Sequence, residues 1–156
     1  MKVRDPMKKA VLFWIAASLA LPGCALTIQP VDFSWSFESV LTADSAGFVS
    51  GQPKTIAFDA GELFRAETDG RETAAGKTVR IIRDTEGFYF VTSPGFKHVY
   101  IFTGAEGKLT LKRKVLIAEQ GMEKPFFNRR ELGIELVANG QAYLLSKKGI
   151  ISGEKK

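Results

Sequence analysis

The chain has 156 residues, with 22 Lys or Arg, 17 Asp or Glu and one Cys, and its formal net charge is +5 at pH 7. A single cysteine excludes an intramolecular disulfide bond, and the length fits one domain of ordinary size. Residues 1–23 carry +3 of the charge, so the remaining 133 residues carry only +2. This small charge argues against a nucleic-acid partner, which would favour a strongly basic surface.

The N-terminus has the parts of an export signal. Basic residues are spread over positions 2–9, and an apolar run of about 12 residues follows at 10–21. This order is typical of a secretory signal peptide. A membrane-spanning helix needs about 20 apolar residues, so cleavage is favoured over a retained helix. Met7 is an alternative start, because Asp5-Pro6 interrupts the basic stretch.

The apolar run ends in Leu21-Pro22-Gly23-Cys24. This segment resembles the lipobox of bacterial lipoproteins, although that family usually has Ala, Ser or Thr where Pro22 stands. The resemblance implies that the signal peptide 1–23 is removed and that Cys24 is lipidated, with palmitate among the acyl groups. Several acyl chains on one residue anchor a protein stably, whereas one chain is marginal. The alternative is an ordinary signal peptide cut after Ala25.

The lipobox resemblance also implies a cellular location. Ala25 follows the cysteine, whereas Asp at that position retains enterobacterial lipoproteins in the inner membrane. The expected location is therefore the outer membrane, facing the periplasm. Residues 24–31 form a short lipidated tether without a Ser/Gly/Pro-rich linker, so the domain that follows should lie close to the membrane surface.

From residue 32 onward the hydrophobic period is two. Phe33, Trp35 and Phe37 alternate with polar residues, as in a half-buried strand. The dipeptide Asn139-Gly140 is a strong signal for a two-residue hairpin turn. Residues 32–148 are thus predicted to form the β domain, and 149–156 a flexible tail in which Ile150 and Ile151 could add a short strand. The other predicted strands are 54–58, 62–68, 77–83, 88–92, 97–103, 108–118, 131–137 and 141–146.

These eight or nine strands, joined by short turns, indicate an all-β fold with a single antiparallel meander. A β-sandwich and a small, partly open barrel both satisfy the pattern. A weak internal echo links Gly47-Phe48 with Gly87-Phe88, about 40 residues later. We interpret it as chance similarity and not as a duplication.

No catalytic or cofactor motif is present. His98 is the only histidine and shares a strand face with Tyr100 and Phe102, which is typical of a packing residue. No Gly-x-Ser-x-Gly elbow accompanies it. One histidine and one lipidated cysteine cannot form a zinc site, and no phosphate loop or dinucleotide fingerprint occurs. The prediction is a non-enzymatic protein without metal or cofactor.

The densest basic cluster lies in the predicted strand 108–118. Alternation from Leu109 predicts that Lys112 and Lys114 point outward, as a solvated face, as an edge protected against aggregation, or as a patch for anionic lipid headgroups or lipopolysaccharide. Arg113 falls on the apolar face, where a charge needs a partner. It should therefore reach a rim, or a bulge should turn it outward.

Segment 120–130 lacks a strand period and is predicted to be a loop. It combines Phe126 and Phe127 with Arg129 and Arg130, and aromatic residues with Arg are enriched at interface hot spots. We therefore consider it an interaction surface. The alternative is that one or both phenylalanines close the end of the core.

The first functional hypothesis is a structural or protein-interaction module of the cell envelope, with an envelope protein as partner and an undetermined oligomeric state. The second is a carrier of a lipid or other apolar ligand, which would require an apolar cavity of roughly 300 Å³ or more. The third is an envelope hydrolase with His98 near a carboxylate and a hydroxyl in a cleft. The aromatic residues proposed to line a carrier cavity are Phe33, Trp35, Phe37, Phe88, Phe90, Tyr100 and Phe102.

Overall fold

The computed structural model describes residues 37–51, 56–105 and 108–151. In this part the strands are antiparallel and form three open sheets, of five, four and two strands. The all-β prediction is confirmed, and the described strands do not close into a barrel. The signal peptide, Cys24, the tether, positions 33–36 and the tail beyond residue 151 lie outside the described residues.

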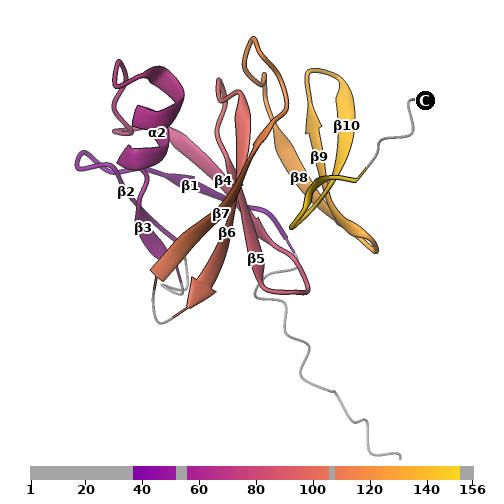
Figure 1. The fold of residues 1–156 in the computed structure, drawn as a ribbon. Coiled ribbons are helices and arrows are strands. Elements are labelled where there is room, and N and C mark those ends of the chain that lie inside the picture. The colour runs from indigo at the N-terminus through magenta and orange to yellow at the C-terminus, as the bar shows by residue number, and fades with distance from the viewer. Residues whose placement is uncertain (1–36, 52–55, 106–107, 152–156) are drawn as a thin grey trace, which may run out of the picture. The chain divides into compact units, whose positions relative to one another are not determined.

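The largest sheet has the strand order β1-β4-β5-β6-β7. Its last four strands follow one another along the chain, as in the predicted meander, while β1 pairs with β4 across a long connection. In Figure 1 this sheet lies between helix α2 and the strands β8 to β10. The strands are β1 (Ser39–Thr42), β4 (Thr78–Arg83), β5 (Phe88–Thr92), β6 (His98–Ala105) and β7 (Lys108–Leu116).

The second sheet is a C-terminal meander with the order β11-β10-β9-β8. Its central hairpin turns at Asn139 and Gly140, whose φ angles of 53° and 73° fit the predicted two-residue turn. The first strand, β8, covers much of what was predicted to be a loop, so that prediction is wrong for its last five residues. The strands are β8 (Phe126–Arg130), β9 (Gly133–Ala138), β10 (Gln141–Ser146) and β11 (Gly149–Ile150).

A two-stranded sheet of β2 (Phe48–Ser50) and β3 (Ala57–Asp59) leads into helix α2 (Gly61–Thr68). The predicted strand 62–68 is therefore wrong. The Asp59 carboxylate accepts a hydrogen bond of 2.7 Å from the Gly61 N–H and satisfies one free donor at the helix start. Leu63, Phe64 and Glu67 then share one helix face and are turned inward.

The sequence similarity between Gly47-Phe48 and Gly87-Phe88 corresponds to two turns with the same hydrogen bonds. Asp44 Oδ1 accepts the N–H groups of Ala46 and Phe48, at 2.8 and 3.0 Å. Asp84 Oδ1 accepts those of Glu86 and Phe88, at 2.9 and 2.8 Å. In each turn the glycine before the phenylalanine has a positive φ, near 90°, which glycine adopts without strain. The likeness therefore reflects shared turn chemistry before strands β2 and β5.

Strand β7 contains a β-bulge that reverses part of the predicted alternation. Ile101 pairs with Arg113 but Phe102 pairs with Leu111, so Lys112 is the extra residue. After a bulge the side chains change faces. Lys114, opposite Tyr100, consequently lies on the same face as Leu111, so the predicted alternation is wrong at this position, although the Lys114 side chain is still 37% exposed.

One hydrophobic core joins both large sheets and the helix. Glu38 adds a polar link: its carboxylate accepts a hydrogen bond of 2.6 Å from Arg80 in β4 and one of 3.0 Å from the Phe127 N–H in β8. Burial raises the pKa of Glu38, although both of these contacts oppose the shift. The largest fully buried side chains are Phe90, Phe96, Ile81, Ile82, Ile101, Met122, Ile134, Leu136 and Leu145.

Candidate functional site

A large concave feature is an open, mostly apolar groove of about 820 Å³. The β2–β3 hairpin and helix α2 form one side, and the ends of β5, β6 and β7 form the other. Charged side chains at its border are Asp59, Glu62 and Lys108. The apolar lining comprises Phe48, Ile56, Ala57, Phe58, Leu63, Tyr89, Phe102, Ala105 and Leu109.

Glycine at position 104 shapes the groove wall. A Cβ atom there would lie 3.0 Å from Cε2 of Tyr89, which is closer than such atoms normally approach. The missing side chain therefore allows the Tyr89 ring to lie across β6. The Arg83 guanidinium stands over this ring, 5.5 Å from its centre, in a cation–π arrangement.

Of the aromatic residues predicted to line a cavity, only Phe102 lines this groove among those described. Phe90 and Tyr100 are buried in the core, and Phe88 packs against it. Phe37 is 72% exposed, while Phe33 and Trp35 lie outside the described residues. Alternation identified aromatic strands, but the groove is lined largely by the hairpin and helix that the sequence pattern did not resolve.

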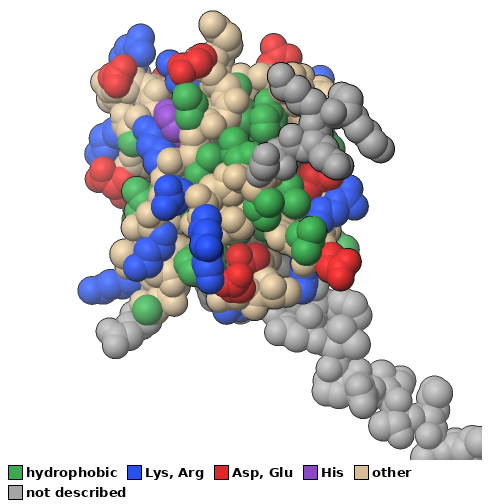
Figure 2. Space-filling view, turned by 45° about the vertical axis from the view of Figure 1, so that its right-hand side comes forward, with side chains coloured by type: hydrophobic (Ala, Val, Ile, Leu, Met, Phe, Trp, Pro, Cys, Tyr) green, Lys and Arg blue, Asp and Glu red, His purple; other side chains and the backbone are tan. Residues whose placement is uncertain are grey.

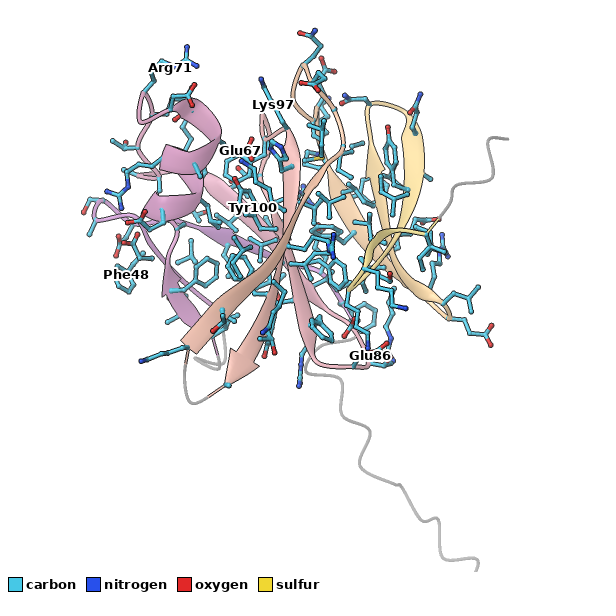
Figure 3. All side chains as sticks on the ribbon, in the orientation of Figure 1. Phe48, Glu67, Arg71, Glu86, Lys97 and Tyr100 are labelled. Carbon is cyan, nitrogen blue, oxygen red and sulfur yellow. The ribbon has the colours of Figure 1, made fainter. Side chains whose placement is uncertain are left out.

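A second feature is a buried carboxylate between α2 and β6, which we call the Glu67 cluster. The last turn of the helix points Glu67 into the protein, and its side chain is only 1% exposed. Glu67 accepts hydrogen bonds from the Lys97 N–H at 2.8 Å, from His98 Nδ1 at 2.8 Å and from the Tyr100 hydroxyl at 2.7 Å. Figure 3 shows Glu67, Lys97 and Tyr100 close together between these elements.

Lys114 completes the cluster from strand β7. Its Nζ lies 3.9 Å from the Glu67 carboxylate and 5.4 Å from the centre of the Tyr100 ring. The position follows from the bulge at Lys112, which turns Lys114 toward the helix-facing side of the sheet. A buried carboxylate with three donors and a nearby cation is well compensated.

The Glu67 cluster meets only part of the requirement stated for a hydrolase. His98 is within hydrogen-bond reach of a carboxylate, but the Tyr100 hydroxyl donates to that same carboxylate. Burial, this hydrogen bond and the charge of Glu67 all raise the pKa of Tyr100 above its ordinary value. The hydroxyl is therefore held as a protonated donor. The groove described above is lined by other residues.

No known protein family, curated protein or solved structure matches this chain. Among the described residues, no three His, Cys, Asp or Glu side chains are grouped to hold a metal ion. The described part of the chain also contains no helix that is long and apolar enough to cross a membrane.

The structure separates the residues predicted for an interaction surface. Phe127 is buried and Phe126 is 40% exposed, so one ring enters the core and the other faces outward. Arg130 forms an ion pair of 2.6 Å with Glu135 and lowers the pKa of that carboxyl, together with a hydrogen bond from Asn128. Arg129 is exposed in the same strand.

The two predicted basic residues of β7 also differ. Lys112 is the exposed bulge residue, whereas Lys114 contacts the Glu67 cluster. Glu67 itself was missed, because segment 62–68 was interpreted as a strand. The helical spacing of Leu63, Phe64 and Glu67 was the signal that could have indicated it.

Proposed function

We propose that this protein is a non-enzymatic, lipid-anchored module of a bacterial envelope that binds the apolar part of a membrane lipid in its groove. The observation that carries the proposal is the open apolar groove of about 820 Å³. This volume exceeds the roughly 300 Å³ required for a carrier and lies within the usual range of ligand sites. The mixed charges at the border suit an amphipathic ligand, whose polar end remains in water.

The anchor part of the proposal is supported by the sequence alone, through the signal peptide and the lipobox ending at Cys24. An outer-membrane location facing the periplasm belongs to the same proposal. In Cys24→Ser the protein should move from the membrane fraction to the soluble fraction. A variant that remains membrane-bound would refute lipid anchoring.

The groove is tested with pyrene-labelled palmitic acid and the purified full chain, by fluorescence titration. Phe48 lines the groove and is 52% exposed, so Phe48→Gln should remove apolar contact with a small effect on folding. A side chain of this size contributes about 1.5–3 kcal/mol when fully buried, and we expect affinity to fall by about tenfold. Phe37→Gln is the matched control, because Phe37 is 72% exposed and lies outside the lining.

The control variant should bind as the wild type does. Equal affinity in the wild type and in Phe48→Gln, or titrations that never saturate, would refute the proposed ligand site.

A protein-interaction module is the second candidate. The observation that favours it is the presence of three exposed apolar side chains in the four-stranded sheet and its turns: Phe126, Leu132 and Ile150, at 40%, 75% and 44% exposure. Single exposed apolar residues are common on soluble proteins. The groove, which gathers nine apolar residues around one space, therefore gives the lipid-binding proposal the stronger support.

A further inference from the structure

Strand β7 combines positive charge and exposed apolar side chains at the end of a sheet. It is the last strand in the order of the five-stranded sheet and pairs there only with β6. Its nine residues, Lys-Leu-Thr-Leu-Lys-Arg-Lys-Val-Leu, include four cations and no acid. Figure 2 shows Lys and Arg side chains gathered in a band to the left of centre.

Most of this charge is uncompensated. Lys108, Lys112 and Arg113 form no ion pair with any described residue, and Lys114 reaches Glu67 only at 3.9 Å. Residues 24–156 together have a formal charge of only +2. The cations of β7 are thus a local concentration of charge on a protein that is otherwise nearly balanced.

Lysines and bulges on an edge strand also prevent pairing with other chains. That role accounts for Lys112 and the bulge, but it does not account for the exposed leucines beside them. Leu111 is 50% exposed and Leu116 is 45% exposed. Single exposed apolar residues are common, but these two leucines share one face of β7, with Lys114 between them along the strand.

We propose that strand β7 is a docking surface for an anionic phospholipid bilayer. By the register against β6, Leu111, Lys114 and Leu116 lie on one face of β7 and Lys108 and Arg113 on the other. The strand would therefore meet the bilayer along its free edge, where cations of both faces can reach lipid phosphates, and each basic side chain near an anionic surface adds measurably to binding. Leu111 and Leu116 would enter the interfacial region below the phosphates. Nucleic acid fits less well, because exposed aliphatic side chains add little to phosphate contacts.

The groove meets this surface at one end of β7. Lys108 and Leu109 line the groove, and they are followed directly by the exposed stretch of the strand. Phe37 is thirteen positions after Cys24, and a chain of that length spans at most about 45 Å when fully extended. An anchored chain would therefore keep β7 within reach of the bilayer.

The test is amide hydrogen exchange, measured by mass spectrometry on the full chain reconstituted through its N-terminal anchor. Vesicles contain either phosphatidylcholine alone or phosphatidylcholine with phosphatidylglycerol. In the anionic vesicles, the amides of residues 108–116 should exchange about tenfold more slowly than in the neutral vesicles. High salt should remove the difference, because it screens the charges.

The double variant Lys112→Glu with Arg113→Glu should lose this protection. Lys124→Glu with Arg71→Glu changes the net charge equally, away from β7, and should keep it. Lys112→Gln gives a milder loss and serves if the double variant is misfolded. Equal exchange in both vesicle types, or equal loss in the control, would overturn the proposal. Slower exchange confined to residues 57–63 would indicate that a lipid occupies the groove without contact between β7 and the bilayer, and it would also overturn the proposal.

Discussion

Replacing the buried carboxylate of the Glu67 cluster should cost much of the stability of the domain. Glu67→Leu keeps a similar side-chain size but removes the acceptor of three hydrogen bonds of 2.7–2.8 Å. Each such bond contributes about 0.5–1.5 kcal/mol, and an orphaned buried donor costs about 1–3 kcal/mol. The Tyr100 hydroxyl is buried, whereas the Lys97 amide and the His98 ring can recover contact with water. The expected loss is about 2–4 kcal/mol.

Urea unfolding followed by circular dichroism measures this loss through the transition midpoint. Glu72→Leu is the matched control, since the Glu72 side chain is 53% exposed and pairs only with Lys77, at 3.1 Å. An exposed ion pair of this kind contributes about 0–1 kcal/mol. The denaturant slope should be unchanged in both variants, because the same surface unfolds. Midpoint shifts of equal size in the two variants would refute the structural importance of the Glu67 cluster.

Two further predictions concern single groups. The pKa of Tyr100 is raised in the folded state. The hydroxyl therefore contributes fully to stability below its ordinary pKa near 10, and this contribution declines as the pH rises above 10, so the free energy of unfolding should fall by up to about 1.4 kcal/mol per pH unit. Urea titrations across pH 9–11 should show a smaller fall in Tyr100→Phe than in the wild type. Gly121→Ala should destabilise by about 2 kcal/mol or more, because φ is 87° and the added Cβ would lie 2.7 Å from the Gly95 carbonyl oxygen; a thermal midpoint like that of the wild type would contradict this packing.

The sequence predicted most of the later strands well, with the exception of β8, because their signals are local. The strand 88–92 was predicted at its observed bounds, and Asn139-Gly140 fixed the last large hairpin. The alternation of apolar and polar residues and the turn residues are determined by near neighbours in the chain, so a single sequence is enough to recognise them. A short strand such as β2, with three residues, contains too little alternation to give such a signal, whereas β11 overlaps the short strand considered at Ile150. The predicted total of eight or nine strands is therefore lower than the eleven described.

The candidate sites were harder to predict because they depend on contacts between distant residues. Glu67 forms hydrogen bonds with His98 and Tyr100, which lie more than thirty positions later in the sequence. The local sequence pattern around Glu67 does not indicate these contacts. The bulge at Lys112 is equally nonlocal, since it is defined by register against β6. A bulge was among the alternatives stated for Arg113, but the sequence could not show that Lys114, and not Arg113, would turn toward the Glu67 cluster.

Helix α2 contributes residues to both the groove and the Glu67 cluster. It provides Glu62 and Leu63 to the groove and Glu67 to strand β6, and a helix of eight residues is marginal without tertiary contacts. A ligand that fills the groove should therefore stabilise the same helix that Glu67 fixes. At a ligand concentration of 100 Kd the wild type should gain about 2.7 kcal/mol. If Glu67→Leu loosens helix α2 in the folded state, the variant binds the ligand more weakly. The same ligand concentration then adds less to its free energy of unfolding than to that of the wild type, and this difference measures the coupling between the groove and the Glu67 cluster.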